Sequence, residues 1–361
     1  MKVLVIATLK EKQVYAKLAP IAALEFVHEI YLVRRYPLSD SNCLSEKLRC
    51  YSVPRLLRWN VVTSELFRIG TIISILARKR IDLVIGIYLV MHGLYAGLAA
   101  KFARVPVIQS IIGRDLFLAL RSPWLMRFIR GADAVTTRGA HTKQLLVEHG
   151  VQSEKIYCPP NVFHFSNEES RKREQSHPRY DLIFVGALVK KKRVDLLLHA
   201  VAEVSKSFAS LQLAVVGDGP ERAKLEDLMH RLGLTGSVHF LGWREEVFPL
   251  LRQARVFVLC SEQEGLPMAL IEAFACGLPA VVTDDADITT VAENRVNSLV
   301  IAKNDRDGLV RALSELLTDR ELYQQLAHNA HRTFEERRAD YSLESVTEEW
   351  REIITCPRGL P

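Results

Sequence analysis

Short apolar runs alternate with helical patterns along the first half of the chain. Such runs, rich in Val, Ile and Leu, are typical of parallel strands that are buried on both faces. Helical patterns between them predict parallel β-α-β units. The candidate strands are Val3–Thr8, Ile30–Val33, Leu83–Ile87, Val107–Ile111 and Ala134–Thr137.

The second half repeats this alternation after a polar stretch. Residues Ser166–Tyr180 contain no aliphatic side chain and are typical of a linker. Helices are expected over Arg306–Leu326 and Tyr341–Thr355. The candidate strands are Leu182–Val185, Leu213–Val216, Val238–Leu241, Val256–Cys260 and Ala280–Thr283.

This pattern predicts an α/β protein with two doubly wound, Rossmann-like domains that face a cleft. Such sheets bind ligands at the carboxyl ends of their strands. We assign residues 1–165 to a first Rossmann-like domain, 166–180 to a linker and 181–335 to a second Rossmann-like domain. Residues 336–361 form a C-terminal helix, for which packing against the first domain is one option.

Residues 81–100 are apolar apart from Asp82 and His92, and two interpretations are open. The length suits a membrane span. We favour a buried strand, a turn at His92-Gly93 and an apolar helix. The N-terminal apolar run is too short for a secretory signal and lacks a cleavage pattern.

Composition favours a globular protein in a reducing compartment. The chain has 361 residues, of which 48% are hydrophobic and 25% charged, which suits two ordinary domains. Its six cysteines form no C-x-x-C pair, and several lie within apolar runs. We therefore expect buried free thiols and a cytoplasmic location.

Charge is unevenly distributed between the halves. Through His177 the chain has 26 Lys and Arg against 14 Asp and Glu, a net +12, whereas the remainder has 22 against 28, a net −6. The basic half suits an anionic partner, such as nucleic acid, an anionic membrane or a phosphate-bearing substrate. No nucleic-acid recognition motif is apparent, so nucleic acid is the weakest of these.

A possible membrane surface lies over Leu56–Ala77. Basic residues interleave there with apolar ones, as in a helix that lies on a bilayer, and a helix packed on the sheet is the alternative. The basic residues in and beside this segment are Arg55, Arg58, Arg68, Arg78, Lys79 and Arg80.

The strongest chemical signal follows the strand Val256–Cys260. Glu264 lies in a glycine-bearing loop before a helix that begins near Pro267 and ends near Gly277. Free N–H groups at such a helix start suit a diphosphate. Glu272 lies roughly 8 Å further along the helix axis, about the distance of a ribose from its phosphates. Taken singly, each glutamate is compatible with an ordinary acidic side chain.

These residues resemble the E-x7-E signature of the family 4 retaining glycosyltransferases, which have the GT-B fold. Further stretches match that family's motifs in order, around Gly186, Lys192 with Arg193, Gly217, and Gly242 with Trp243. The resemblance implies that Glu264 contacts the transferred sugar, Glu272 the ribose and Lys192 the diphosphate. The expected donor-binding residues are Gly186, Lys192, Arg193, Gly217, Gly242, Trp243, Glu264, Gly265, Leu266, Pro267 and Glu272. A core or surface tryptophan is an equal alternative for Trp243.

The chain departs from the family pattern at several positions. Ala187 stands where the family has an arginine, and Arg193 is the hypothetical substitute. Ile112 replaces the usual histidine, so His92 is either catalytic or structural. The glycine-rich loop after the first strand is replaced by a stretch with two lysines. The expected acceptor-side residues are Lys10, Lys12, Gly113 and Asp115, and the expected catalytic residues are Glu264, Lys192 and His92.

We expect a retaining transferase that moves a sugar from a UDP-, GDP- or ADP-linked donor to a hydroxyl acceptor. No cofactor or metal is expected, and the strings Asp285-Ala-Asp287 and Asp305-Arg-Asp307 are interpreted as loop and helix-start acids. The basic half suits an anionic or lipid-linked saccharide acceptor, or peripheral contact with the anionic inner membrane face. A sugar-nucleotide epimerase and a nucleotide-sugar-binding protein remain as alternatives.

Overall fold

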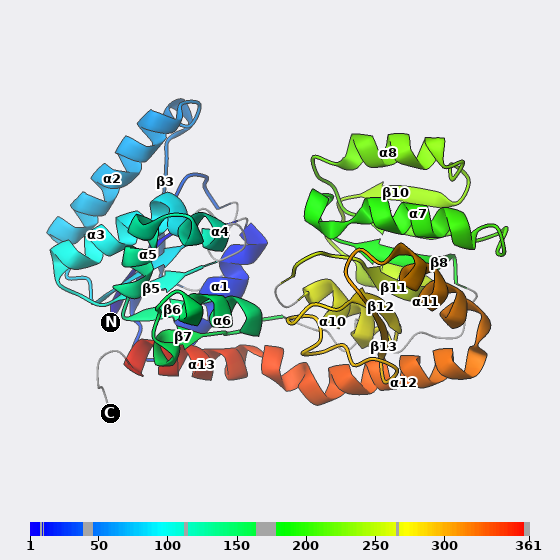
Figure 1. Cartoon of the computed structure of the whole chain (residues 1–361). Coiled ribbons are helices and arrows are strands. Elements are labelled where there is room, and N and C mark those ends of the chain that lie inside the picture. The colour runs from blue at the N-terminus through cyan, green and yellow to red at the C-terminus, as the bar shows by residue number, and fades with distance from the viewer. Residues whose placement is uncertain are drawn as a thin grey trace. The chain divides into compact units, whose positions relative to one another are not determined.

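The protein forms two compact units, described by a computed structural model (Figure 1). One unit comprises Met1–His164 with Asp340–Pro361, and the other comprises Phe165–Ala339. The structure describes residues 1–7, 9, 11–38, 46–111, 115–163, 178–264 and 267–356, and only the backbone of 11, 12, 115 and 117. No helix in these ranges is long and apolar enough to cross a membrane.

Unit 1 is built on a parallel sheet that has, among the described residues, the order β3-β2-β1-β4-β5-β6-β7. The order reverses between β1 and β4, which pair directly through Val3 with Leu83. The strands are β1 (Lys2–Ile6), β2 (Glu29–Arg34), β3 (Leu48–Ser52), β4 (Leu83–Ile87), β5 (Val107–Ser110), β6 (Ala134–Thr136) and β7 (Ile156–Tyr157).

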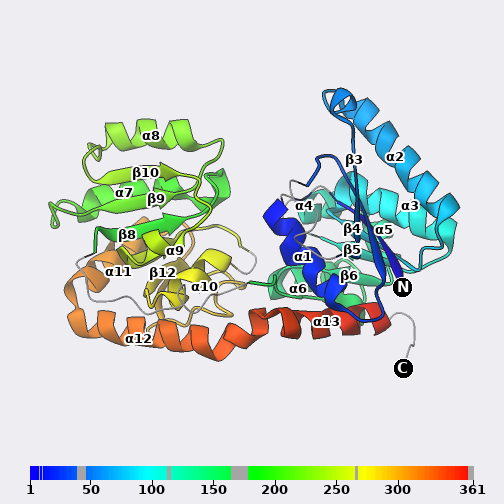
Figure 2. The same ribbon diagram turned by 180° about the vertical axis from the view of Figure 1, so that it is seen from behind.

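Helices cover both faces of this sheet, because alternate strand residues are buried in two different cores. The helices are α1 (Glu11–Ala23), α2 (Val61–Arg78), α3 (Leu94–Ala103), α4 (Asp115–Leu120), α5 (Pro123–Arg130), α6 (Ala140–Glu148) and α13 (Leu343–Thr355). Short turns are η2 (Arg55–Leu57), η3 (Leu89–Gly93) and η4 (Ser153–Lys155). Val3 and Val5 share one core with Leu18 of α1 and Trp350 of α13. Figure 2 shows α1 beside α13, which pack against each other.

Unit 2 repeats this plan with a parallel sheet of order β10-β9-β8-β11-β12-β13 among its described residues. The strands are β8 (Tyr180–Val185), β9 (Leu213–Val216), β10 (Val238–Gly242), β11 (Ala254–Leu259), β12 (Ala280–Thr283) and β13 (Ser298–Ile301). In this sheet the order reverses between β8 and β11. Helix α7 packs on α11, and α10 packs on α12.

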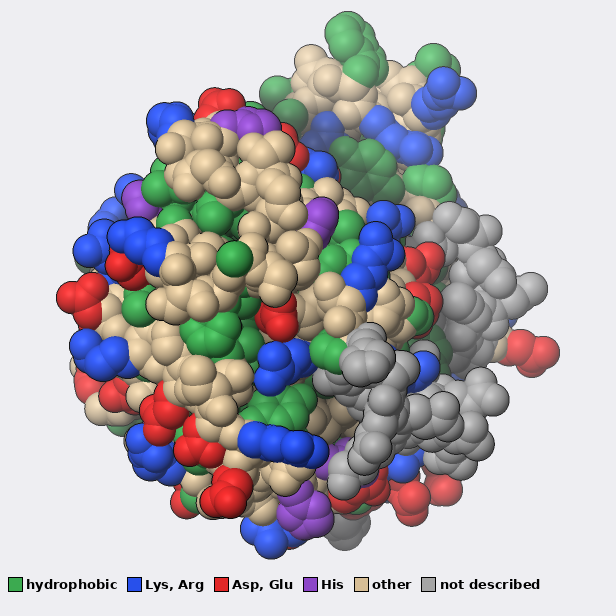
Figure 3. Space-filling model, turned by 90° about the vertical axis from the view of Figure 1, so that its right-hand side faces the viewer, with side chains coloured by type: hydrophobic (Ala, Val, Ile, Leu, Met, Phe, Trp, Pro, Cys, Tyr) green, Lys and Arg blue, Asp and Glu red, His purple; other side chains and the backbone are tan. Residues whose placement is uncertain are grey.

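Helices and short turns connect the strands of unit 2 and follow the last of them. They are η5 (Lys190–Lys192), α7 (Val194–Val204), α8 (Arg222–Arg231), α9 (Phe248–Leu251), α10 (Met268–Ala275), α11 (Arg306–Thr318), α12 (Arg320–Arg337) and η6 (Arg338–Tyr341). Acidic and basic side chains are interspersed over the face of unit 2 that Figure 3 presents.

The predicted α/β class and parallel strands are confirmed, with local corrections. The sequence pattern missed β3, β7 and β13, which are short or lack a continuous apolar run. The single helix expected over Arg306–Leu326 is wrong, because Asp319 ends α11 and accepts a hydrogen bond from Leu322 N–H to begin α12. In residues 81–100, β4 is followed by η3 and α3, as the strand interpretation predicted.

The expectation of buried thiols holds for only part of the set. Cys260 and Cys276 are buried, and burial raises the pKa of each to about 12. The expectation is wrong for Cys158 and Cys356, which are exposed because they follow the last strand and the last helix of unit 1. All four are free thiols.

We predict that Trp350→Ala destabilises unit 1 selectively. Trp350 is 3% exposed and lies in the α1–α13 core, so truncation should cost about 3–5 kcal/mol. Hydrogen exchange followed by mass spectrometry should show that amide protection is lost in β1 and α1 and is retained in β8 and β11. Trp243→Ala, at a 64% exposed position, is the control. Equal loss of protection in both units would contradict the prediction.

Candidate active site

The candidate site lies at the carboxyl ends of β8 and β11, where the strand order of unit 2 reverses. These strands pair directly, with Leu182 opposite Val256 and Ile183 opposite Phe257. The chain segments that follow two such strands leave the sheet in opposite directions. A crevice therefore opens where the strand order reverses. The chain after β8 forms η5 with Lys192, and the chain after β11 leads to Glu264. The backbone N–H of Glu262 donates to Lys191 O at 2.9 Å and joins the two segments.

Lys192 and Glu264 form an ion pair at this point. Lys192 Nζ donates to Glu264 Oε1, and the Ser261 hydroxyl donates to the same oxygen. The side chains of Lys192 and Glu264 are 15% and 8% exposed, so the pair is largely shielded from water. Thr283 Oγ1 donates to Ser261 O at 2.6 Å and fixes the loop to β12. The ammonium is thereby held where the resemblance expects a diphosphate.

Arg193 adds a second cation beside the pair, but its charge is already balanced. Its backbone is left-handed, with φ of 49°, between η5 and α7. The guanidinium contacts Asp195 at 3.1 Å and Glu262 at 3.1 Å, and it also donates to Asn304. Hydrogen bonding to Asp195 is the main cause that raises the pKa of Arg193. Arg193 must therefore exchange partners before it can bind a phosphate.

Three glycines lie side by side at the ends of β8, β9 and β10. Gly186 N–H donates to Val216 O, and Gly217 N–H donates to Gly242 O, both at 2.9 Å. Gly217 has φ of 138°, and a Cβ there would lie 1.9 Å from Gly186 O. Gly217 requires glycine because its loop touches the backbone of Gly186, whereas Gly242 favours glycine because of its φ of 72°.

Helix α10 follows β11 in the chain. Leu270 N–H donates the first helical hydrogen bond, to Pro267 O at 2.9 Å, so the N–H groups of Met268 and Ala269 precede it. Pro267 is the N-cap rather than the first helical residue, one position from the expectation. At the other end Leu278 N–H donates to Ala273 O and Gly277 N–H to Phe274 O, a Schellman end with Gly277 at φ of 70°.

Glu272 lies on the less buried side of α10. Its neighbours Ile271 and Ala273 are buried, whereas Glu272 is half-buried. It follows the helix start by the spacing that the sequence suggested. The helix therefore carries a carboxylate at a fixed distance from its N-terminal amides.

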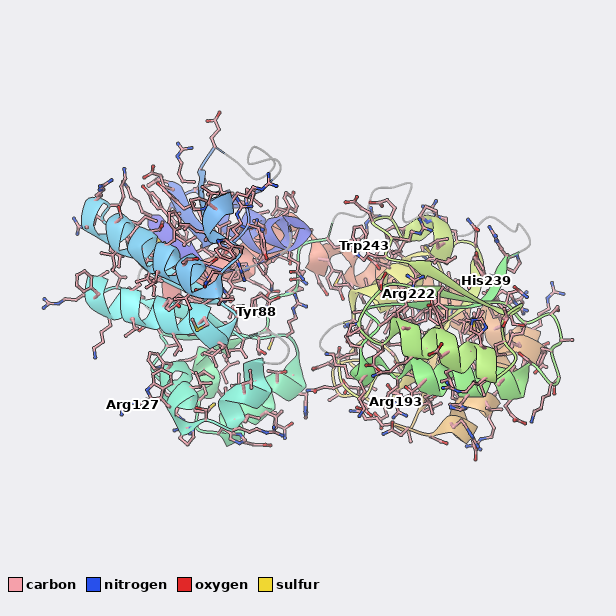
Figure 4. The ribbon with its side chains drawn as sticks, turned by 90° about the horizontal axis from the view of Figure 1, so that it is seen from above. Tyr88, Arg127, Arg193, Arg222, His239 and Trp243 are labelled. Atoms are coloured by element: carbon pink, nitrogen blue, oxygen red, sulfur yellow. The ribbon has the colours of Figure 1, made fainter. Side chains whose placement is uncertain are left out.

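Trp243 and Arg222 lie at the β10 edge of the glycine row and are labelled in Figure 4. Trp243 is 64% exposed, so it is not a core residue. Arg222, which the sequence pattern did not reveal, begins α8 and pairs with Asp218 at 3.1 Å and Glu226 at 2.8 Å. A Cβ on Gly242 would lie 3.4 Å from Arg222 Nη1. The signal for Arg222 was its position just after the glycine-rich turn at Gly217.

Two family models match the chain in tandem. The model for group 1 glycosyl transferases matches residues 166–333, and the glycosyl transferase 4-like domain matches residues 12–161. The chain belongs to the family 4-like glycosyltransferases. The matched regions coincide largely with the two units of the structure.

The chain is similar to several curated proteins, and its fold is similar to that of solved structures. The chain is 29% identical, over 66% of its length, to the exopolysaccharide phosphotransferase SCO2592 of Streptomyces coelicolor. It is 29% identical, over 72% of its length, to the GalNAc-α-(1→4)-GalNAc-α-(1→3)-diNAcBac-PP-undecaprenol α-1,4-N-acetyl-D-galactosaminyltransferase of Campylobacter jejuni, of which the match covers 71%. Anabaena Alr3699/HepE in complex with UDP and glucose has a TM-score of 0.77 and 17% identity, covering 99% of this chain and 100% of HepE.

The match spans only part of several relatives. It covers 24% of the Streptomyces protein and about half of two other curated relatives, at 48% each.

His92 of this glycosyltransferase lies in η3, directly after β4 of unit 1. Its ring lies 6.5 Å from that of Tyr88 between centroids. Burial and then the charge of Arg68 lower the pKa of His92 to about 3. The imidazole is therefore neutral near pH 7 and suits hydrogen bonding rather than proton abstraction. Its catalytic role stays a prediction.

Several expected site residues lie outside the described part of the chain. These are Lys10, Gly113, Gly265 and Leu266, together with the side chains of Lys12 and Asp115. The two aspartate strings are described. Asp305 caps α11 as expected, whereas Asp285 and Asp287 are buried, and Asp285 pairs with Lys303 at 2.7 Å. Among the described residues no group of three or more His, Cys, Asp or Glu could hold a metal ion.

We predict that Gly217→Ala disrupts the glycine row. The added Cβ would meet Gly186 O, so unit 2 should lose about 3 kcal/mol or more, and the backbone ends of β8 and β9 should separate. Chemical denaturation and binding of a nucleotide-sugar panel by calorimetry measure the two effects. Gly236→Ala is the control, because nothing lies within 4 Å of its Cβ position. Unchanged stability in Gly217→Ala would refute the prediction.

Proposed function

We propose that this glycosyltransferase moves a sugar from a nucleoside-diphosphate sugar to a hydroxyl of an acceptor saccharide. Transfer retains the anomeric configuration and needs no metal ion or cofactor. The observation that carries the proposal is the Lys192–Glu264 pair at the strand reversal, beside the glycine row and α10. That arrangement offers a cation, helix amides and two carboxylates along the length of one donor.

The donor runs along the start of α10 in this proposal. Glu272 accepts hydrogen bonds from the ribose hydroxyls, and the glycine row admits the diphosphate. Trp243 and the adjacent backbone contact the base. HepE, which has the same fold, was solved with UDP and glucose, and this supports a UDP-linked donor.

Lys192 stabilises the leaving diphosphate when the glycosidic bond breaks. The transition state places negative charge on the β-phosphate, which an ammonium and the N-terminal amides of α10 can balance without metal. Glu264 then exchanges Lys192 for hydroxyls of the transferred sugar. The acceptor attacks from the face that the diphosphate leaves, and a phosphate oxygen takes its proton.

The acceptor is a lipid-linked or anionic saccharide, as the basic first half favours. The Campylobacter relative is named for a PP-undecaprenol saccharide, which supports this class. An epimerase would need acid and base groups against the sugar. The described residues of unit 1 offer His92, whose pKa near 3 disfavours that role.

We expect Glu272→Gln to raise the donor KM by about 10–100-fold, since it weakens hydrogen bonds to a charged group.

Lys192→Gln should lower kcat by about 100–1000-fold, since it removes a transition-state cation. The assay measures nucleoside diphosphate released from a donor panel with lipid-linked acceptors and EDTA. Glu336→Gln, on exposed α12, is the control. Loss of release in EDTA would disprove metal independence, and donor binding without release would favour a binding protein.

We also propose that η2 and α2 of unit 1 rest on an anionic bilayer at the cytoplasmic membrane face. Val62, Leu66 and Ile73 recur at helical spacing on α2 and are 59–65% exposed. Trp59, at 86% exposed, precedes the helix. The exposed basic residues Arg55 and Arg78–Arg80 flank this stripe and can bind anionic headgroups. Arg68 instead lies buried on the opposite side, 2% exposed, and pairs with Glu65 at 3.0 Å.

We predict that Trp59→Ser combined with Leu66→Ser weakens binding to phosphatidylglycerol vesicles by about 10–100-fold, since two large apolar side chains leave the bilayer. Flotation measures the bound fraction, and added salt should weaken wild-type binding. Trp243→Ser, at a position of unit 2 as exposed as Leu66, is the control and should bind like the wild type. Binding of the double variant that matches the wild type would disprove this docking face.

A further inference from the structure

A lysine is buried in unit 1, in the helix that covers the carboxyl end of β1. Lys17 lies on α1 and is 6% exposed. Burial and then the charge of Arg138 lower the pKa of Lys17 to about 7. A buried ammonium is costly unless an anion accompanies it. The charge at Lys17 therefore needs a reason beyond packing.

Arg138 is a second cation in this region; it is half-buried and follows β6 by two residues. Burial lowers the pKa of Arg138, yet a guanidinium stays charged at any physiological pH. Its Nε is buried without a hydrogen-bond partner among the described residues. The charge of Arg138 therefore acts on Lys17, and neither side chain forms an ion pair within the described part of the chain.

Polar groups gather around these cations at the carboxyl end of the sheet. The hydroxyls of Thr136 and Thr137 are buried and have no hydrogen-bond partner among the described residues. Thr136 lies two residues after Ala134 on β6 and therefore on the same face of the sheet, the face whose core includes Tyr88, Leu18 of α1 and residues of α13. Tyr88, which is labelled in Figure 4, directly follows β4, and its electrostatic interaction with Arg138 raises the pKa of that guanidinium against the larger effect of burial.

The lysine can reach this edge from the middle of its helix. Side chains on a helix tilt toward its N-terminus, and α1 starts at the carboxyl end of the sheet. Arg34, at the end of β2, adds a further cation there, with Nη2 bound to Leu9 O at 2.7 Å. The reversal between β1 and β4 makes this edge the expected ligand position of unit 1.

We propose that Lys17 and Arg138 form an oxyanion subsite that binds a phosphate or carboxylate of the acceptor. The assignment to the acceptor rests on the proposed function, because unit 2 provides the donor residues. An ammonium, a guanidinium and the Thr136 hydroxyl together match the oxygens of such a group. The bound anion offsets the repulsion between the two cations.

This subsite makes anion affinity depend on pH. In the free protein Lys17 loses its proton near pH 7, and a bound anion raises that pKa. Above pH 7 binding must therefore include uptake of a proton, so affinity falls by up to about tenfold per pH unit. Other titratable groups near α1 are Tyr88, Arg34 and, on the packed helix α13, Glu349 and Glu352. Burial is the main cause that raises the pKa of Glu349.

The test measures binding of inorganic phosphate and of succinate by calorimetry between pH 6 and pH 9 at constant ionic strength. All proteins carry Lys192→Gln, which removes the cation of unit 2 that could also bind phosphate. We expect Lys17→Met and Arg138→Gln each to weaken binding at least about tenfold. Lys101→Met, at an exposed lysine of α3, should bind like the parent protein.

Lys17→Arg distinguishes a binding role from a structural one. Arginine keeps its charge across this range, so the variant should bind phosphate without the decline above pH 7. Circular dichroism establishes that each variant is folded. Equal affinity of the parent and Lys17→Met for both anions, or no binding of either anion by the parent, would overturn the proposal.

The two proposals fail in different ways. If phosphate binds through Lys17 and no nucleotide sugar binds or reacts in wild type, the subsite stands and the proposed function is wrong. If nucleoside diphosphate is released with an acceptor and Lys17→Met leaves both the acceptor KM and phosphate affinity unchanged, the subsite is wrong and the proposed function stands.

Discussion

The direct pairing of β8 with β11 is the constraint on which the donor site depends. These strands are neighbours in the sheet although they are far apart in the chain, and the connections after them leave in opposite directions. The pairing brings Lys192 within bonding reach of Glu264, 72 residues later. It also brings Lys192 next to Gly186, where an added Cβ would lie 3.6 Å from Lys192 Cε. A shift of one residue in this register would separate the cation from the carboxylate.

The Lys192–Glu264 pair has a physical role before any donor binds. Each charge alone would be expensive in this shielded position, and the pair offsets that cost. A donor diphosphate and its sugar hydroxyls can replace each partner in turn, so binding exchanges one set of charge-assisted contacts for another. Arg193 is likewise paired, with Asp195 and Glu262, and would have to exchange these partners for a phosphate. The charges of these side chains are therefore balanced within the site.

Unit 1 handles its charges differently. Lys17 is buried and Arg138 is half-buried, and neither forms an ion pair among the described residues. In our proposal an external anion is the partner of both, which agrees with the excess of basic residues in this half of the chain. The two units share a reversal of strand order but use it for opposite electrostatic arrangements. In the proposed reaction the diphosphate of the donor leaves with its charge, whereas the anionic group of the acceptor stays bound. The two electrostatic arrangements suit these two roles.

Much of the fold and one contiguous part of the site followed from the sequence alone. Apolar runs such as Leu83–Ile87 and Leu213–Val216 predicted strands at their observed bounds, because strands buried on both faces must be continuously apolar. The spacing of Glu264 and Glu272 was readable because one loop and one helix carry both. Local patterns did not reveal β13 or the break at Asp319, where a capping side chain outweighs the helical period. The contacts of Lys192 with Glu264, of Arg193 with Glu262, and the burial of Lys17 were decided by tertiary structure. They join residues from different strands and helices, and burial depends on what packs against a helix rather than on the helix's own sequence.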